Sequence, residues 1–93
     1  MNEALVIIPT YNESDNIVQI INSIFSIHKE INILVVDDNS PDGTSDKVKE
    51  VISNFNNNLF LLTRKSKLGL GSAYLYGFKW AISKNYKYVI SMD

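Results

Sequence analysis

Four short apolar runs alternate with three segments of helical periodicity, and this alternation restricts the fold more than any other feature of the sequence. The runs span residues 4–8, 31–36, 59–62 and 88–92. The first three are hydrophobic at nearly every position, whereas a strand with one wet face alternates apolar and polar residues. Strands buried on both faces of a parallel sheet have this continuous pattern. We therefore expect a parallel sheet built from βαβ units.

Apolar residues three and four positions apart predict the three helices between these runs. The first is expected to be capped by Ser14 or Asp15, and the second by Thr44. The third, residues 72–84, is expected to bury Ala73, Gly77, Phe78, Ala81 and Ile82. Right-handed crossovers then place helices on both faces of the sheet. The prediction is an α/β, Rossmann-like βαβαβαβ fold with strand order 3-2-1-4, in a single domain over residues 1–93.

Composition excludes several classes of function. The chain of 93 residues has no cysteine, which rules out disulfides, thiolate zinc sites and a cysteine nucleophile. Its single histidine argues against a histidine metal site or a Ser-His-Asp triad. A net charge of −1 indicates no basic surface for nucleic acid. A secretory signal and a membrane-length apolar stretch are both missing from the 93 residues, so we expect a cytoplasmic protein.

Ligands of open α/β sheets bind beyond the carboxyl ends of the strands, so the residues that follow each strand are the candidate site. The loop after the first strand, residues 9–13, contains no glycine, which argues against the Gly-rich loop of dinucleotide-binding proteins. It offers the ring of Tyr11 and the carboxylate of Glu13. Asp37 and Asp38 directly continue the second buried strand and could accept hydrogen bonds from ribose or a base. Turn formation explains residues 40–43 well, but it does not explain this acidic pair.

The last two strands are followed by weaker signals. Arg64, Lys65 and Lys67 lead into Gly69 and Gly71 at the start of a helix. This segment could bind an anion at the helix N-terminus, or it could equally be an exposed basic loop with a glycine turn. A single carboxylate, at residue 93, follows the fourth strand, and one oxygen ligand does not make a metal site.

Four segments in this order resemble the amino-terminal half of inverting, GT-A type glycosyltransferases of family 2. They are residues 6–13 (VIIPTYNE), 35–44 (VVDDNSPDGT), 67–74 (KLGLGSAY) and 92–93 (MD). The first is similar to a segment found in many family-2 enzymes. Residues 40–44 together with 69–71 are similar to segments of a smaller group of these enzymes, and resemble the polyprenol-phosphate (dolichol-phosphate) mannosyl- and glucosyltransferases.

The resemblance implies a role for each matching residue. The nucleotide base and ribose would be lined by Pro9, Tyr11 and Glu13, and held by Asp37 and Asp38, with Asp38 in direct contact. The segment from Arg64 to Gly71 would lie along the nucleotide-sugar site, with Lys67 near the phosphates. Asp93 would be the first acid of an Asp-x-Asp motif that places Mg²⁺ or Mn²⁺ on the diphosphate.

The implied reaction is inverting transfer of a hexose, with mannose favoured, from a nucleotide sugar to polyprenyl phosphate. GDP-mannose is the favoured sugar donor and UDP-glucose the alternative. The 93 residues match only the nucleotide-sugar-binding half, a partial domain, so we expect no catalytic residue within them and little activity from them alone. Acceptor binding would fall to residues outside them, and the parent protein could associate with the cytoplasmic face of a membrane.

Three other interpretations remain at this point. The chain could belong to a family-2 transferase with another acceptor, such as a polysaccharide or a cell-wall glycan. It could be a non-catalytic interaction module, because the fourth strand would be an unpaired sheet edge. A phospho-receiver domain is suggested only by the adjacent acids, which in a receiver follow the first strand.

Overall fold

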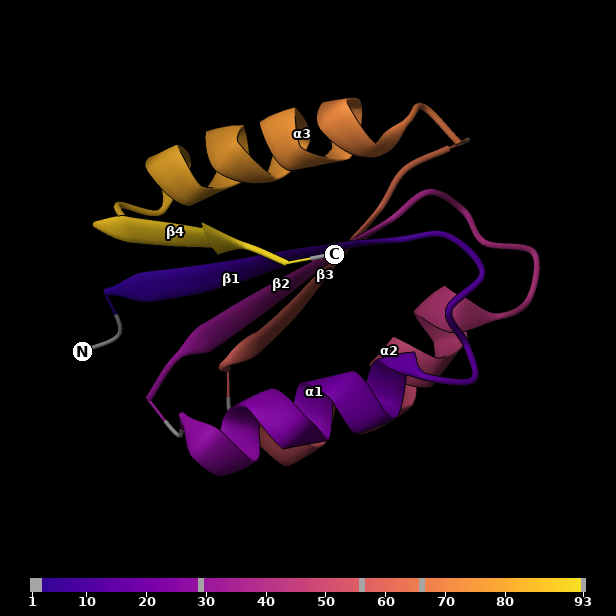
Figure 1. The fold of residues 1–93 in the computed structure, drawn as a ribbon, viewed down its shortest axis with the longest axis horizontal. Coiled ribbons are helices and arrows are strands. Elements are labelled where there is room, and N and C mark those ends of the chain that lie inside the picture. Colours follow the sequence, from indigo (N-terminus) through magenta and orange to yellow (C-terminus); the bar gives the residue numbers. More distant parts are fainter. Residues whose placement is uncertain (1–2, 29, 56, 66, 93) are drawn as a thin grey trace.

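The computed structural model describes residues 3–28, 30–55, 57–65 and 67–92, which form a four-stranded parallel sheet between two helical layers. In chain order the elements are β1 (Ala4–Thr10), α1 (Ile17–Ile27), β2 (Asn32–Asp37), α2 (Thr44–Ile52), a 3-10 turn (Ser53–Phe55), β3 (Leu59–Thr63), α3 (Leu70–Ser83) and β4 (Tyr88–Ser91). The strand order β3-β2-β1-β4 and the parallel pairing confirm the predicted topology. Figure 1 shows α3 on one face of the sheet and α1 and α2 on the other.

Both faces of the two central strands are buried, which explains their continuous hydrophobicity. Successive strand residues point to opposite faces. One set packs toward α1 and α2, and includes Val6, Ile8, Ile33 and Val35. The other set packs toward α3, and includes Leu5, Ile7, Leu34 and Val36. Removing this much apolar surface from water is the main stabilising contribution to a fold of this size.

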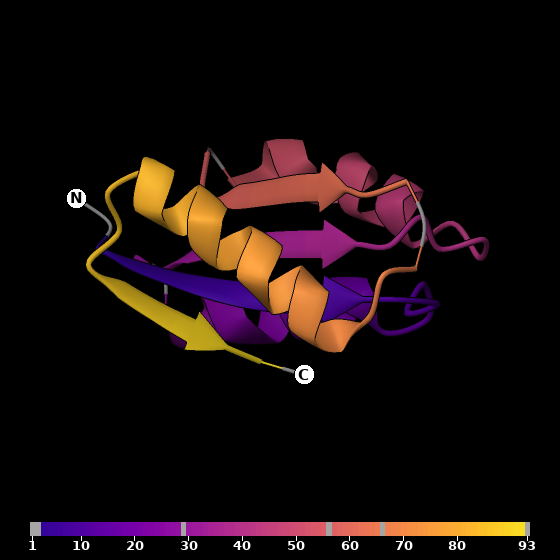
Figure 2. The ribbon, with the colours of Figure 1, turned by 90° about the horizontal axis from the view of Figure 1, so that it is seen from above.

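A stripe of small residues lets α3 lie close to the sheet, which it crosses obliquely in Figure 2. Ala73, Gly77 and Ala81, four residues apart, are buried as predicted. A Cβ added at Gly77 would lie 2.9 Å from Cγ2 of Ile7, so this position has no room for a side chain. The predicted burial of Phe78 and Ile82 is wrong, because they are 38% and 74% exposed. They lie one position beyond the small-residue stripe, on the side of α3 that turns away from the sheet.

The predicted helix caps are also wrong. Asn16 precedes α1 without a side-chain capping bond, and the Glu13 carbonyl accepts hydrogen bonds from the amides of Asn16 and Ile17 instead. Gly43, with a φ of 87°, precedes α2, and Thr44 is the first helical residue. The Thr44 hydroxyl is fully buried and bonds to another loop, so it is not free to cap its own helix.

The fourth strand lies at an edge of the sheet with its side chains exposed. Tyr88 is 63% exposed and Ile90 is 46% exposed. An apolar groove runs between β4 and α1, lined in part by Val6, Ile24, Ile27, Ile90 and Met92. The position of β4 at the edge of the sheet is the feature on which the interaction-module hypothesis depends. Within the described ranges, no helix combines the length and hydrophobicity needed to cross a membrane.

Candidate functional site

Three loops meet at the carboxyl ends of β1, β2 and β3, on the right of Figure 1. The backbone ties them together just beyond the strands. The Asp38 amide donates to the Thr10 carbonyl at 3.1 Å, and the Arg64 amide donates to the Asp37 carbonyl at 2.7 Å. The backbone pairing of the strands therefore continues into the loops: Asp38 is held next to the end of β1, and Arg64 next to the end of β2.

Asp37 is completely buried and its carboxylate is used by the protein itself. Oδ1 accepts hydrogen bonds from the hydroxyls of Thr10 (2.7 Å) and Ser40 (2.6 Å). Oδ2 accepts from the Ser40 amide (3.0 Å) and the Ser45 hydroxyl (2.8 Å). A carboxylate has about four acceptor positions, and all four are filled. Asp37 therefore holds the loop between β2 and α2 in shape, a structural role that the sequence did not indicate, while its contact with a nucleotide stays a prediction.

Asp38 forms a buried, bidentate ion pair with Arg64. Arg64 Nε donates to Oδ1 at 2.6 Å and Nη2 donates to Oδ2 at 2.9 Å, and both side chains are 6% exposed. The Leu68 amide donates to Oδ2 as well, at 3.2 Å. Burial alone raises the pKa of Asp38, but the hydrogen bonds from Arg64 and Leu68, with the charge of Arg64, outweigh it and hold the pKa below its usual range. Asp38 is therefore ionised at neutral pH.

Arg64 also organises the segment that leads into α3. Its Nη1 donates to the Ser72 hydroxyl at 2.7 Å, and Nη2 donates to the Gly69 carbonyl at 3.3 Å. Sequence reasoning treated Arg64 as one of three cations available to an anion, and it missed this pairing. The pairing follows from the sheet register, because Asp37 pairs with Thr63 and the next residues on the two strands have opposite charges.

The segment Ser40–Thr44 fastens the loop after β1 to the loop after β2. The Ser40 hydroxyl accepts from the Asn12 amide at 2.9 Å, and Asp42 Oδ2 accepts from the Ser14 amide at 3.1 Å. Thr44 Oγ1 accepts from the Glu13 amide at 3.0 Å and donates to Asp42. The Thr44 hydroxyl bond lowers the pKa of Asp42. This motif therefore braces the loop that carries Tyr11 and Glu13, a role that turn chemistry alone did not suggest.

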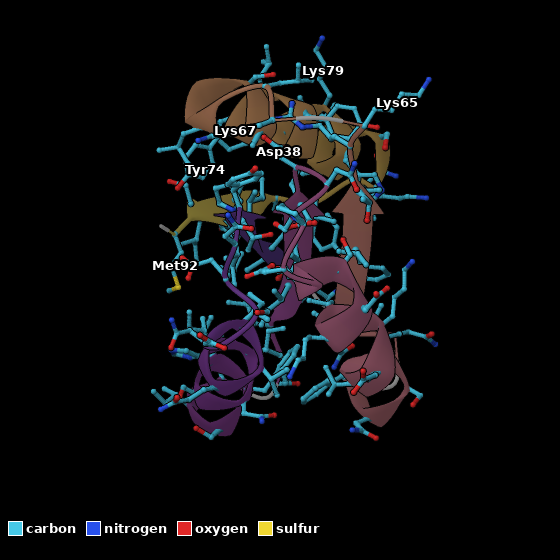
Figure 3. The ribbon with its side chains drawn as sticks, turned by 90° about the vertical axis from the view of Figure 1, so that its right-hand side faces the viewer. Asp38, Lys65, Lys67, Tyr74, Lys79 and Met92 are labelled. Atoms are coloured by element: carbon cyan, nitrogen blue, oxygen red, sulfur yellow. The ribbon has the colours of Figure 1, made fainter. Side chains whose placement is uncertain are left out.

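A small cavity of about 130 Å³ lies between the first and third of these loops. Its lining is Pro9, Thr10, Tyr11, Asp38, Lys67, Gly69, Leu70 and Ala73. Lys67 Nζ lies 4.7 Å from the centroid of the Tyr11 ring. Figure 3 shows Lys67 and Asp38 near each other beneath α3. Sites for whole small ligands usually measure about 300–1,000 Å³, so this cavity suits one part of a ligand, such as a ring.

The structure thus brings together four of the predicted site residues and leaves others apart. Pro9, Tyr11, Asp38 and Lys67 share the cavity. Glu13 is half-buried and lines a different pocket, beside α1. Gly71 is exposed in the first turn of α3. The predicted metal ligand, Asp93, lies outside the described residues.

The described residues do not by themselves form a metal site. Among residues 3–28, 30–55, 57–65 and 67–92, no three His, Cys, Asp or Glu side chains are grouped so that they could hold a metal ion. At the carboxyl ends of the strands, the carboxylates of Asp37 and Asp38 are already bonded to protein groups.

Comparison with known proteins identifies relatives for nearly the whole chain. The chain is 43% identical over 89 residues to polyprenol monophosphomannose synthase from Mycolicibacterium smegmatis, covering 96% of this chain and 34% of the relative. It is 38% identical over 89 residues to undecaprenyl-phosphate mannosyltransferase from Micrococcus luteus, covering 96% and 36%. The chain thus spans about a third of the length of these curated relatives.

A solved structure shares the fold. It is a mannosyltransferase from Pyrobaculum calidifontis in complex with GDP-Man and Mn²⁺, with a TM-score of 0.77 and 26% identity, covering 85% of this chain and 24% of that one. The fold is therefore the GT-A type that the resemblance implied. The family model described as glycosyl transferase family 2 matches residues 5–93. The chain belongs to glycosyltransferase family 2.

Proposed function

We propose that this chain binds the nucleotide of a sugar donor, and that the full protein transfers mannose from GDP-mannose to a polyprenyl phosphate with inversion. The observation that carries the proposal is the cavity at the carboxyl ends of the strands, where a ring, a buried carboxylate and an ammonium group converge. Two mannosyltransferase relatives whose names specify polyprenol or undecaprenyl phosphate support the acceptor class. The bound GDP-Man of the structural relative supports the sugar donor.

The cavity offers complementary contacts to a nucleoside. The exposed ring of Tyr11 gives a base a surface for stacking, with Pro9 beside it. Asp38 lines the cavity, and its carboxylate would accept an additional hydrogen bond from a base N–H or a ribose hydroxyl. Because Asp38 stays ionised, that additional bond would be charge-assisted and strong. The carboxylate of Glu13, on the same loop as Tyr11, would accept a hydrogen bond from the ribose.

The phosphates would lie toward the start of α3. Lys67 supplies a mobile positive charge there, and the backbone at Gly71 belongs to the first turn of the helix, where N–H groups favour anions. Asp37 would act through the loop that it holds. Asp93 would contribute to a Mg²⁺ or Mn²⁺ site, and the ion would neutralise the charge that develops on the leaving nucleoside diphosphate.

The remaining steps would fall to the part of the relatives that this chain does not match. A polyprenyl phosphate is already ionised, so its oxygen needs little activation before it attacks the anomeric carbon. Its lipid tail would bring the full protein to a membrane, at the cytoplasmic face. The 93 residues would bind the sugar donor without turning it over.

Calorimetric titration of GDP-mannose and UDP-glucose, each with Mn²⁺, tests this proposal on the 93-residue chain. We expect GDP-mannose to bind more tightly than UDP-glucose. Tyr11→Ala should weaken binding about 5- to 150-fold, since base stacking contributes roughly 1–3 kcal/mol. The matched control is Tyr88→Ala, because Tyr88 is an exposed tyrosine on β4. Equal losses in the two variants, or no binding of either nucleotide sugar, would contradict the proposal.

A further inference from the structure

The ammonium of Lys67 lies against the ring of Tyr11 at the candidate site. The two residues come from different loops, after β3 and after β1, and both line the same cavity. The 4.7 Å separation between Nζ and the ring centroid is within the range of a cation–π contact. Within the part of the chain that the structure describes, this ring contact is the one electrostatic interaction recorded for the Lys67 ammonium.

This contact occupies the surface that a nucleotide base would use. A base that enters the cavity stacks on the side of the Tyr11 ring that faces the cavity, and that side is where Lys67 lies. One face of a ring has no room for both an ammonium group and a stacked base. Nucleotide binding at Tyr11 therefore requires Lys67 to leave the ring. Its flexible four-carbon stem allows this movement without a change in the backbone.

We propose that Lys67 selects nucleoside diphosphates over nucleosides by exchanging one contact for another. In the free protein its ammonium covers the Tyr11 ring, and in the complex the base replaces it while the ammonium pairs with a phosphate oxygen. A ligand with phosphates compensates for the lost ring contact, whereas a nucleoside displaces the lysine without compensation. This inference rests on the proposed function, because it assumes that the cavity takes a nucleotide.

The exchange predicts opposite effects of one substitution on two ligands. Lys67→Met keeps an unbranched side chain but removes the charge. Guanosine should bind about two- to fivefold more tightly to this variant, since the cation–π contact no longer competes. GDP gains the same two- to fivefold, but it loses about 30-fold because its terminal phosphate, with about two negative charges, no longer meets the ammonium, so its net affinity should fall about 5- to 15-fold. If Lys67 only contributed favourable contacts to each ligand, the substitution would weaken the binding of both guanosine and GDP.

Amide chemical-shift titrations with guanosine and with GDP, both without metal, measure these effects. The matched control is Lys65→Met on the same loop, because the Lys65 side chain points away from Lys67 in Figure 3 and its backbone carbonyl, not its ammonium, bonds to Asn39. We expect the control to leave the ratio of the two affinities unchanged. A shift of both affinities in the same direction in Lys67→Met overturns the exchange while leaving the proposed function intact. If the wild type binds neither guanosine nor GDP, the exchange and the proposed function are both overturned.

A measurement without ligand tests the first half of the exchange separately. The aromatic ring should move the side-chain methylene protons of Lys67 next to Nζ upfield, and Tyr11→Leu should abolish that displacement. Addition of GDP to the wild type should abolish it too, since the ammonium then leaves the ring. An undisplaced Lys67 signal in the free protein, or a displacement that persists in the GDP complex, overturns the inference.

Discussion

The buried Asp38–Arg64 pair leads to a stability prediction that can be worked out in detail. Arg64→Met keeps an unbranched side chain of similar length but removes the guanidinium group. Asp38 would then keep only the backbone amides of Leu68 and Gly69 among the hydrogen-bond donors described for it, and the Ser72 hydroxyl and the Gly69 carbonyl would lose a partner. The variant would therefore leave a carboxylate charge almost unpaired in a buried site.

The expected cost is a large fraction of the total stability. Both side chains are only 6% exposed, so solvent screens the pair weakly. Removing one partner of such a pair costs about 3–5 kcal/mol. A chain of this length has a free energy of unfolding of roughly 5–14 kcal/mol, from about 0.05–0.15 kcal/mol per residue. Arg64→Met should therefore leave the protein folded only marginally, or unfold it.

Urea unfolding measures this cost. Trp80 lies between Phe60 and Tyr86, with ring centroids 5.1 and 6.1 Å away, so its fluorescence should report loss of the packing beneath α3. With a slope of about 1–3 kcal/mol per molar urea, the midpoint should fall by roughly 1–5 M without a change in slope. Circular dichroism should give the same midpoint if the transition is two-state.

A double variant separates the unpaired charge from the loss of packing. Asp38→Leu with Arg64→Met replaces both charges by apolar groups, and should recover at least half of the loss caused by Arg64→Met alone. If the single variant lies within about 1 kcal/mol of the wild type, the pair is not the stabilising contact described here. If the double variant is no more stable than the single one, an unpaired charge is not the cause.

Three further predictions concern acid stability, helix packing and loop bracing. The folded-state pKa of Asp38 is lowered, so the stability that the ionised carboxylate contributes is present above the unfolded-state pKa and is lost as the pH falls through the folded-state pKa. The difference in unfolding free energy between wild type and Asp38→Asn should therefore shrink below about pH 4 in urea titrations, and a constant difference would contradict this. Gly77→Ala should cost about 1–3 kcal/mol of stability because its Cβ meets Ile7, whereas Gly71→Ala, with nothing within 4 Å of its Cβ, should gain up to about 1 kcal/mol. Equal urea midpoints for the two variants would refute the close approach of α3 to β1 at Gly77. Thr44→Val should cost about 1–3 kcal/mol because the Glu13 amide loses its acceptor, and Thr44→Ser should restore most of it; a Ser variant as unstable as Val would contradict the bracing role.

The topology could be predicted because the sheet imposes a simple rule on the sequence. Strands covered on both faces must be apolar at every position, as residues 33–36 are, and parallel strands must be joined by helices. The burial of individual helix residues was harder to predict. Neighbours such as Gly77 and Phe78 point about 100° apart around α3, and only the position of the sheet decides which of them is covered.

The candidate site was predictable to the level of loops, and less so to the level of contacts. Tyr11, Asp38 and Lys67 follow three different strands, and the carboxyl ends of parallel strands place them at one edge. The side-chain partners of Asp37 and Thr44 depend on loop conformations that have no periodic signal. The Asp38–Arg64 pair depends on the sheet register, which the strand boundaries alone do not determine.

Mapping where GDP-mannose binds, by amide chemical shifts of the 93-residue chain in the presence of Mg²⁺, tests the proposed nucleotide site most directly. We expect the largest shifts in the loops that carry Tyr11, Asp38 and Lys67, with little change at the opposite end of the sheet around His28 and Tyr86. Saturable shifts confined to those three loops would support a nucleotide site at the carboxyl edge. Shifts centred on the groove between α1 and β4, or no shifts at millimolar GDP-mannose, would contradict it.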